Sequence, residues 1–318
     1  MLDRQNMTST VGLSIEIELG WAKHDKGETN HLSDFRREET DVLERLLSHC
    51  ERVNIPITFN VVGHLLLESC DGTHLNRPGA ESWFEFDPGT NVETDPLFYA
   101  PDLIEKIRDS SVTHEICTHT FSHTPCNDTT PETVAWELAE ARRVHESAGL
   151  DWSNTLVPPR HSPPDYEVAL DHGIDTLRIP VPKRTFQMTK PERLYYSLIA
   201  PHPLKPPQRT SGMCLVYSSP YLSLAAPHLP HGQLDPHPIF QVIPRRIRKR
   251  WHRRQLRTAL QRVTEREQTA HFWSHLWDIS NSVQWPLVKS FLSELSEMRD
   301  DDKIEIVRLG DVRERVSI

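Results

Sequence analysis

Apolar and polar residues alternate along several short stretches of the chain, and most of these stretches are followed by a segment with helical spacing. In residues 11–19, Leu13, Ile15 and Ile17 alternate with polar residues, which is the two-residue period of a β-strand. Residues 34–53 instead carry apolar side chains three and four positions apart, as an amphipathic helix does. The start of the chain therefore predicts a strand followed by a helix.

The same order of elements recurs along most of the chain. Further strands are predicted at 57–63, 114–117, 155–159, 174–180, 213–219, 270–280 and, together with a turn, 303–312. Further helices are predicted at 101–110, 132–148, 163–172, 245–267 and 284–299. Strands that alternate with helices form parallel sheets, so the pattern predicts an α/β sheet or barrel.

One long segment interrupts this order. Residues 181–242 are rich in proline and show no clear period, so we expect long loops there with one or two strands. Because strands and helices resume afterwards, the chain predicts a single domain over 10–318, with an irregular insertion at about 181–242. Residues 1–9 are expected to form a flexible N-terminus.

Composition narrows the class of protein. The chain has 318 residues, of which 37% are hydrophobic, and its net charge of -9 argues against nucleic acid as a general partner. No apolar run approaches the roughly 18 residues that a membrane span needs, and the first residues lack the apolar segment of a signal peptide. We therefore expect a cytoplasmic protein with no membrane span; its oligomeric state is not predicted.

The five cysteines are scattered along the chain, with no pair in a C-x-x-C arrangement. This spacing argues against a disulfide framework and against a thiolate zinc site, and it fits a reducing compartment. The cysteines are Cys50, Cys70, Cys117, Cys126 and Cys214.

Polar residues gather at the predicted ends of the strands, which is where parallel α/β folds bind ligands. The first strand carries Glu16 and Glu18, and the segment after 114–117 carries His119 and His123, four positions apart. Other such residues are Arg160 and His161 after one strand, and His271, His275 and Asp278 in the late aromatic strand. If the sheet is continuous, these side chains converge.

This set of residues indicates a metal centre. Glu16 and Glu18 alternate with apolar neighbours, so both side chains point to one face, and two carboxylates inside a barrel need a cation or a proton. A cation held by two imidazoles and one carboxylate keeps an open position, which is typical of a catalytic zinc site. A water bound there becomes nucleophilic. The second carboxylate could take its proton, and a histidine could protonate the leaving group.

Several of these stretches resemble the polysaccharide deacetylases, carbohydrate esterase family 4. HTFSH (119–123) resembles the family's histidine motif, and ITFNVVG (57–63) resembles the strand that the family often writes as ATFFVVG. SIEIELGW resembles a first motif with acids spaced acid-x-acid, and LVPPRHSP resembles the third motif. The late aromatic strand resembles the motif with a histidine acid. The likeness spans most of 11–312.

The resemblance implies a fold and an activity. The fold is an irregular (β/α) barrel, and the activity is that of a metal-dependent hydrolase that removes an N-acyl group, expected to be acetyl, from an amino sugar or glycan. By this resemblance Glu18, His119 and His123 bind the metal. Zinc is the expected ion, with Co, Ni, Mn and Fe as alternatives.

The resemblance also implies roles for residues around the metal. Glu16 would be the base, and Arg160 would orient it. His275 matches the position of the acid better than His271 does. Both acids of the first motif are glutamates, one methylene longer than the family's usual aspartates.

Other functions stay open at this point. The same site could act on a small non-sugar amide, or the chain could be a catalytically silent relative that binds a glycan or a partner protein. The basic helix predicted at 245–267 is expected to be a solvated outer helix, and an anionic glycan, a lipid headgroup or an acidic partner is the alternative.

Overall fold

The computed structural model describes most of the chain. Residues 1–8, which make up most of the expected flexible terminus, lie outside the described residues, as do 182–203 and 219–221 of the expected insertion. The described ranges are 9–74, 76–79, 81–181, 204–218, 222–266 and 268–316. Within these ranges no helix is both long and apolar enough to cross a membrane.

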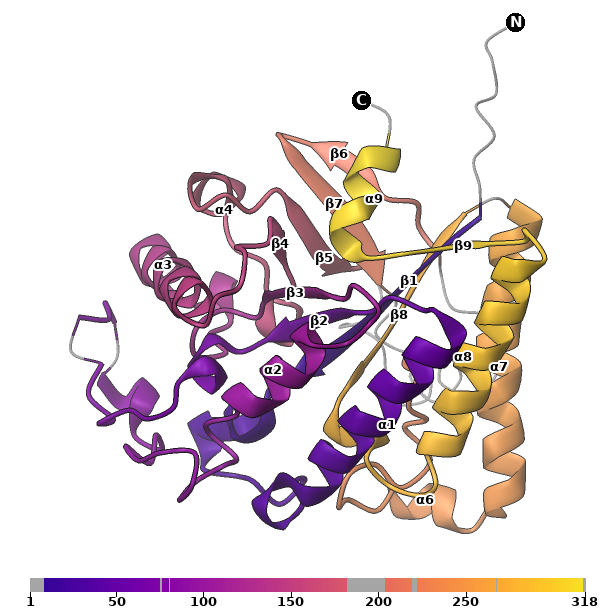
Figure 1. The fold of residues 1–318 in the computed structure, drawn as a ribbon, viewed down its shortest axis with the longest axis horizontal. Helices are drawn as coiled ribbons and strands as arrows, with labels where there is room; N and C mark the ends of the chain where they lie inside the picture. The colour runs from indigo at the N-terminus through magenta and orange to yellow at the C-terminus, as the bar shows by residue number, and fades with distance from the viewer. Residues whose placement is uncertain are drawn as a thin grey trace, which may run out of the picture.

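A curled, mostly parallel sheet forms the centre of the molecule (Figure 1). Its strands are β1 (Thr10–Ile17), β2 (Thr58–Val61), β3 (Glu115–Thr118), β4 (Thr155–Leu156), β5 (Thr176–Pro180), β6 (Gln208–Thr210), β7 (Met213–Ser218), β8 (Thr269–His275) and β9 (Glu305–Val307). The strand order is β6-β7-β5-β4-β3-β2-β1-β8, and β9 pairs with the start of β1. β6 pairs antiparallel with β7, and the other neighbouring strands pair parallel.

The sheet curls because its two ends approach each other. β7 lies near β8, and a bridge between Ser223 and Trp273 joins the segment after β7 to β8. The outcome is an irregular (β/α) barrel, which confirms the predicted fold class. Strands from before and after the expected insertion share this one sheet.

The helices cover the outer face of the sheet, with α2 and α3 near β2 and β3, and α1, α8 and α7 near β1 and β8 (Figure 1). Their bounds are α1 (Arg37–Val53), α2 (Pro101–Arg108), α3 (Pro131–Ser147), α4 (Tyr166–Asp171), α6 (Pro238–Gln241), α7 (Arg245–Arg266), α8 (Trp285–Asp300) and α9 (Leu309–Arg315). Pro131 occupies the first turn of α3, and the Thr130 hydroxyl caps it by accepting from the Thr133 backbone N–H.

The two faces of β1 explain why polar residues lie inside the barrel. All eight residues of β1 are buried. Leu13 and Ile15 belong to the apolar cluster that also holds side chains of α1 and α8. Ser14 and Glu16 point the other way and contact Arg178 of β5 across the barrel interior. The alternation in the sequence therefore separates an apolar layer under the helices from a polar interior.

Helix α9 closes the end of the barrel at which β2 and β3 begin. The backbone N–H of Leu309 donates to the Thr58 hydroxyl, and that of Gly310 donates to the Glu115 carboxylate, so α9 lies at the N-terminal ends of β2 and β3. The sequence predicted a strand and a turn over 303–312. The strand is present as β9, but a helix that begins at Leu309 takes the place of the expected turn. A seven-residue helix with two buried apolar side chains, Leu309 and Val312, leaves too little periodicity to recognise.

Several predicted strands also end earlier than expected. β1 ends at Ile17, β4 at Leu156 and β8 at His275. Short 3-10 turns, such as η1 (Leu19–Lys26), follow at these ends. The apolar patterning continues into the turns because they too are packed against the core, and this is why the sequence extends the strands.

Candidate active site

A cavity of about 240 Å³ lies at the carboxyl ends of the strands. Its walls contain two acids, three histidines, three cationic side chains and two tryptophans. They are Glu16, Glu18, Lys23, His123, Arg160, His161, Arg178, Trp273, His275 and Trp277, together with Ala22 and Pro158.

Glu18 and two histidines form a closely packed polar cluster beside this cavity. Glu18 follows the last residue of β1, and the loop after β3 carries the histidines. The Nε2 atoms of His119 and His123 lie 3.0 Å and 3.2 Å from the same oxygen, Oε1 of Glu18. All three side chains are buried. The structure therefore brings together three of the residues that the sequence singled out.

This geometry fits a divalent cation. The Nδ1 atom of His119 lies 2.5 Å from the Val157 carbonyl oxygen and must donate to it, which leaves the Nε2 lone pair of a neutral imidazole facing a carboxylate oxygen. Two lone pairs at that distance repel each other unless a cation or a second proton lies between them. The three donor atoms lie within 4.8 Å of one another, and one carboxylate with two imidazoles is a common zinc donor set.

The ionisation of the cluster also fits metal ligation. Burial alone would raise the pKa of Glu18, but the imidazoles of His123 and His275 and the hydrogen bond with His119 hold that pKa well below its usual value. Burial lowers the pKa of His123 despite the opposing effect of Glu18. An ionised carboxylate beside a neutral imidazole is the state in which both groups offer lone pairs to a cation.

Glu16 lies beside this cluster but has different partners. The Arg178 guanidinium donates to Oε1 of Glu16 and also, over 2.9 Å, to the Ser14 hydroxyl. The Oε2 atom of Glu16 lies 3.9 Å from Nε2 of His119 and 3.5 Å from Nε2 of His275. Glu16 thus keeps one carboxylate oxygen directed at the cavity while Arg178 fixes the other.

His275 lies across the cavity from the histidine loop, at the end of β8. Its Nδ1 atom lies 2.7 Å from Oδ2 of Asp278, and its ring stacks on that of Trp277 at 4.9 Å between centroids. Burial disfavours its charge, but Glu18, Asp278 and Glu16 together raise the pKa of His275 to about 10. His275 is therefore protonated at neutral pH and can donate a proton from Nε2.

His271, the alternative to His275, lies deeper in the barrel. Its Nε2 atom is 2.8 Å from the Ser14 hydroxyl, and its Nδ1 atom packs against Gly12, where a Cβ atom would approach within 2.7 Å. Burial first, and the nearby Arg178 second, hold the pKa of His271 well below its usual value. A neutral, enclosed imidazole in that place serves packing of the barrel.

Arg160 lines the cavity but does not contact Glu16. Its Nη2 atom lies 2.5 Å from Oδ1 of Asp25 in the turn after β1. Its neighbour His161 is half-buried, and desolvation together with the charge of Arg178 lowers the pKa of His161 to about 4. The arginine that contacts the expected base is Arg178, which the sequence did not single out. The available signal was an arginine in the otherwise apolar strand TLRIP, where an inward cation needs an acidic partner.

The loop that carries the histidines is fixed by α3. Glu137 accepts hydrogen bonds from the Ser122 backbone N–H at 2.8 Å and from the hydroxyls of Ser122 and Thr124 at 2.6 Å and 2.8 Å. Arg77 pairs with the same carboxylate at 3.0 Å. His123 has a φ of 60°, a backbone conformation that costs a non-glycine residue energy. These contacts hold the loop in the shape that turns His123 toward Glu18.

Comparison with known proteins confirms the resemblance found in the sequence. The family model for polysaccharide deacetylases matches residues 25–176. This range contains HTFSH and LVPPRHSP but not Glu16, Glu18 or His275. The match supports a hydrolase of the deacetylase class. No curated protein matches the chain.

Solved structures support the fold. A polysaccharide deacetylase structure from Mycobacterium smegmatis superposes with a TM-score of 0.62 at 13% identity, covering 99% of this chain and 92% of that one. A polysaccharide deacetylase structure from Pseudomonas aeruginosa PAO1 gives a TM-score of 0.55 at 11% identity, with coverage of 97% and 91%. Puue allantoinase gives 0.58 at 10% identity, with coverage of 98% and 91%. At these identities the likeness concerns the fold alone.

Proposed function

We propose that the chain is a metal-dependent N-deacetylase that hydrolyses the acetamido group of an amino sugar or glycan. Glu18, His119 and His123 would hold the metal, with zinc as the expected ion. The observation that carries the proposal is the approach of two imidazole Nε2 atoms to one oxygen of Glu18, at 3.0 Å and 3.2 Å, beside an open cavity. The family match supports the type of bond that is broken.

The remaining residues supply acid and base chemistry. A divalent cation held by Glu18, His119 and His123 would polarise the amide carbonyl and acidify a water molecule. Glu16, held by Arg178, takes a proton from the attacking water through Oε2. His275, protonated and oriented by Asp278, gives its Nε2 proton to the departing amine. Arg178 replaces Arg160 in this account as the residue that positions the base.

The cavity walls are consistent with one sugar ring as the group bound. Trp273 and Trp277 offer aromatic surface, and Lys23 and Arg160 provide hydrogen-bond donors at the edge. We also propose that 10–318 act as one domain, because the base, the metal ligands and the acid come from β1, the loop after β3 and β8 of the same sheet.

Acetate release from N-acetylated amino sugars tests the proposal. The full chain is assayed with free, nucleotide-linked and oligomeric N-acetyl sugars and with small non-sugar amides. We expect acetate release from at least one sugar, loss of activity on chelation, and recovery when zinc is returned. Hydrolysis of the small amides alone would favour an amidase. Glycan binding without hydrolysis by the metal-loaded chain would favour a silent relative.

A further inference from the structure

A second cluster of metal-ligand side chains lies in the long connection between β2 and α2. It consists of His64, Cys70, His74 and Asp87. His64 belongs to the 3-10 turn η3 (Gly63–Leu66), and the other three lie between η3 and α2, where the described chain has no α-helix. None of these residues belongs to the cavity described above.

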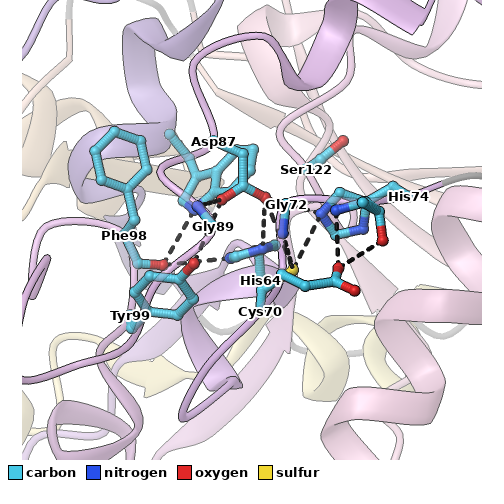
Figure 2. A network of polar contacts seen from close by, with 12 residues as sticks. His64, Cys70, Gly72, His74, Asp87, Gly89, Phe98, Tyr99 and Ser122 are labelled. Carbon is cyan, nitrogen blue, oxygen red and sulfur yellow. Dashed lines mark hydrogen bonds and ion pairs between the residues drawn. The ribbon is translucent and has the colours of Figure 1, made fainter.

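The four side chains point toward one another (Figure 2). The Oδ2 atom of Asp87 lies 3.2 Å from Nε2 of His64 and 2.8 Å from Nε2 of His74. The Sγ atom of Cys70 lies 3.4 Å from Nε2 of His74 and 3.9 Å from Oδ2 of Asp87. The side chains of His64 and Asp87 are fully buried, and that of His74 is 9% exposed.

These separations match a tetrahedral zinc site. Ligand atoms about 2.0–2.3 Å from a central zinc, at tetrahedral angles, lie about 3.3–3.6 Å from one another. The four distances given above run from 2.8 Å to 3.9 Å and so include that range, and all four ligand atoms lie within 4.8 Å of one another. One thiolate, two imidazoles and one carboxylate all belong to the ligands that zinc prefers, and the two anions would balance its charge in a buried place.

The atoms around the cluster direct its lone pairs inward. Nδ1 of His64 faces the Phe98 carbonyl oxygen at 3.3 Å, so Nε2 is left to face the cluster, where it is buried 3.2 Å from Oδ2 of Asp87. The other carboxylate oxygen of Asp87, Oδ1, accepts from the Gly89 N–H at 3.1 Å. The N–H of Gly72 points at Sγ of Cys70 at 3.3 Å (Figure 2). Such outer contacts orient the ligands of metal sites.

We propose that His64, Cys70, His74 and Asp87 bind a structural zinc ion that fixes the connection between β2 and α2. Four protein ligands leave no open position, which distinguishes this site from the three-ligand cluster of Glu18, His119 and His123. The inference goes beyond the proposed deacetylase activity and does not depend on it. It runs against the expectation drawn from the cysteine spacing, which argues against a thiolate zinc site. The proposed ligands include one cysteine of a loop and no C-x-x-C pair.

A zinc ion in this cluster would also stabilise the loop that carries His119 and His123, because His64 and His74 contact Phe121 of that loop. The His64 backbone N–H donates to the Phe121 carbonyl at 2.8 Å, and the Phe121 ring lies 5.4 Å from the His64 ring and 5.6 Å from the His74 ring. The ring of Trp21, in the turn that follows Glu18, packs on His64 at 4.3 Å. The second site thus contacts both segments that carry the ligands of the first.

Metal analysis of the full chain, purified without chelators, tests the proposal. We expect about two zinc ions per wild-type chain and about one in Cys70→Ala. Cys117→Ala is the matched control, because Cys117 is buried in the barrel two positions before His119, and we expect it to keep about two. His119→Ala should lose the other ion and keep the one bound by Cys70. An unchanged zinc content in Cys70→Ala would overturn the proposal.

A spectrum of the cobalt-substituted chain tests the same point if Cys70→Ala does not fold. The cluster of Glu18, His119 and His123 contains no cysteine, so a thiolate-to-cobalt charge-transfer band in the wild-type chain would come from the second site. We expect the band in the wild type and in Cys117→Ala. A cobalt-loaded wild-type chain without the band would overturn the proposal. Neither readout depends on deacetylase activity, so the two proposals can fail separately.

Discussion

Glu16 and Glu18 stand two positions apart at the end of one strand, yet their surroundings give them different chemistry. Glu18 faces two imidazole nitrogens, and Glu16 faces a guanidinium. A carboxylate between imidazoles is suited to hold a cation, whereas one held by Arg178 keeps a free oxygen for a proton. The environment, and not the residue type, separates the proposed ligand from the proposed base.

Replacing Glu16 tests this separation at the level of one residue. In Glu16→Gln the proposed base is lost while Glu18, His119 and His123 remain, so we expect kcat to fall by roughly 10²–10⁴ with zinc content unchanged. Glu146→Gln, on the exposed side of α3, is the control and should keep full activity. Full activity of Glu16→Gln would contradict the role of Glu16, and loss of zinc would show that it is a ligand.

The sequence could predict most residues of this site because they lie at the carboxyl ends of strands or just after them. Glu16, Glu18, His119, His123 and His275 were found in this way. Arg178 was not found, because a buried cation inside a strand can be assigned only when its partner across the barrel is known. Arg160 was favoured instead by the resemblance of LVPPRHSP to the family's third motif, but it pairs with Asp25.

At the scale of elements, α9 shows how far periodicity reaches. Long helices such as α1 and α8 were predicted within a few residues because their apolar faces repeat over several turns. α9 has seven residues and was missed. It owes its position to contacts with Thr58 and Glu115 at the base of the barrel, which no local pattern reveals.

Substitution of Leu309, a buried side chain of α9, tests whether this helix stabilises the barrel by packing against its base. Leu309 is 0% exposed, so we expect Leu309→Ala to lower the free energy of unfolding by about 2–5 kcal/mol. Because α9 lies at the end opposite the cavity, kcat should stay within about twofold of the wild type at temperatures where the variant is folded. Denaturant unfolding and an activity assay measure the two effects.

Leu170→Ala is the matched control, since Leu170 is 38% exposed on α4. It should change the free energy of unfolding by about 0.5–1 kcal/mol at most. An equal effect of the two substitutions would mean that α9 does not pack against the barrel.

At the scale of the whole molecule, buried neutral histidines make stability depend on pH. Burial lowers the pKa of His145 in α3 from 6.5 to about 4, although the Ala141 carbonyl opposes this by accepting from its Nδ1. Between pH 6.5 and about pH 4, the unfolded chain therefore binds a proton at His145 that the folded chain does not bind. The contribution of such a group is fully present above pH 6.5 and is lost as the pH falls toward 4, by up to about 3 kcal/mol.

Unfolding curves across this window test the linkage. We expect the free energy of unfolding of the wild type to fall between pH 6.5 and 4. In His145→Gln the fall should be shallower by up to about 1.4 kcal/mol per pH unit, the slope for one proton. His237→Gln, at an exposed position, should leave the slope unchanged. Equal slopes in all three chains would show that His145 is not buried in its neutral form.

The whole-molecule arrangement was predictable only in outline. Alternation of strands and helices indicated the α/β class, and the resemblance indicated the irregular barrel. The long connection after β2 carried no periodicity, so its cluster of His64, Cys70, His74 and Asp87 was not foreseen. These four side chains are spaced irregularly, 6, 4 and 13 positions apart, and come together only through the fold of that loop.

An anomalous-difference map from crystals of the zinc-loaded chain, collected at the zinc edge, tests the central claim most directly. The account predicts a peak within bonding distance of Glu18, His119 and His123, about 2.0–2.2 Å from the ligand atoms, and open toward the cavity. A map from fully loaded crystals without a peak among these three side chains would contradict it.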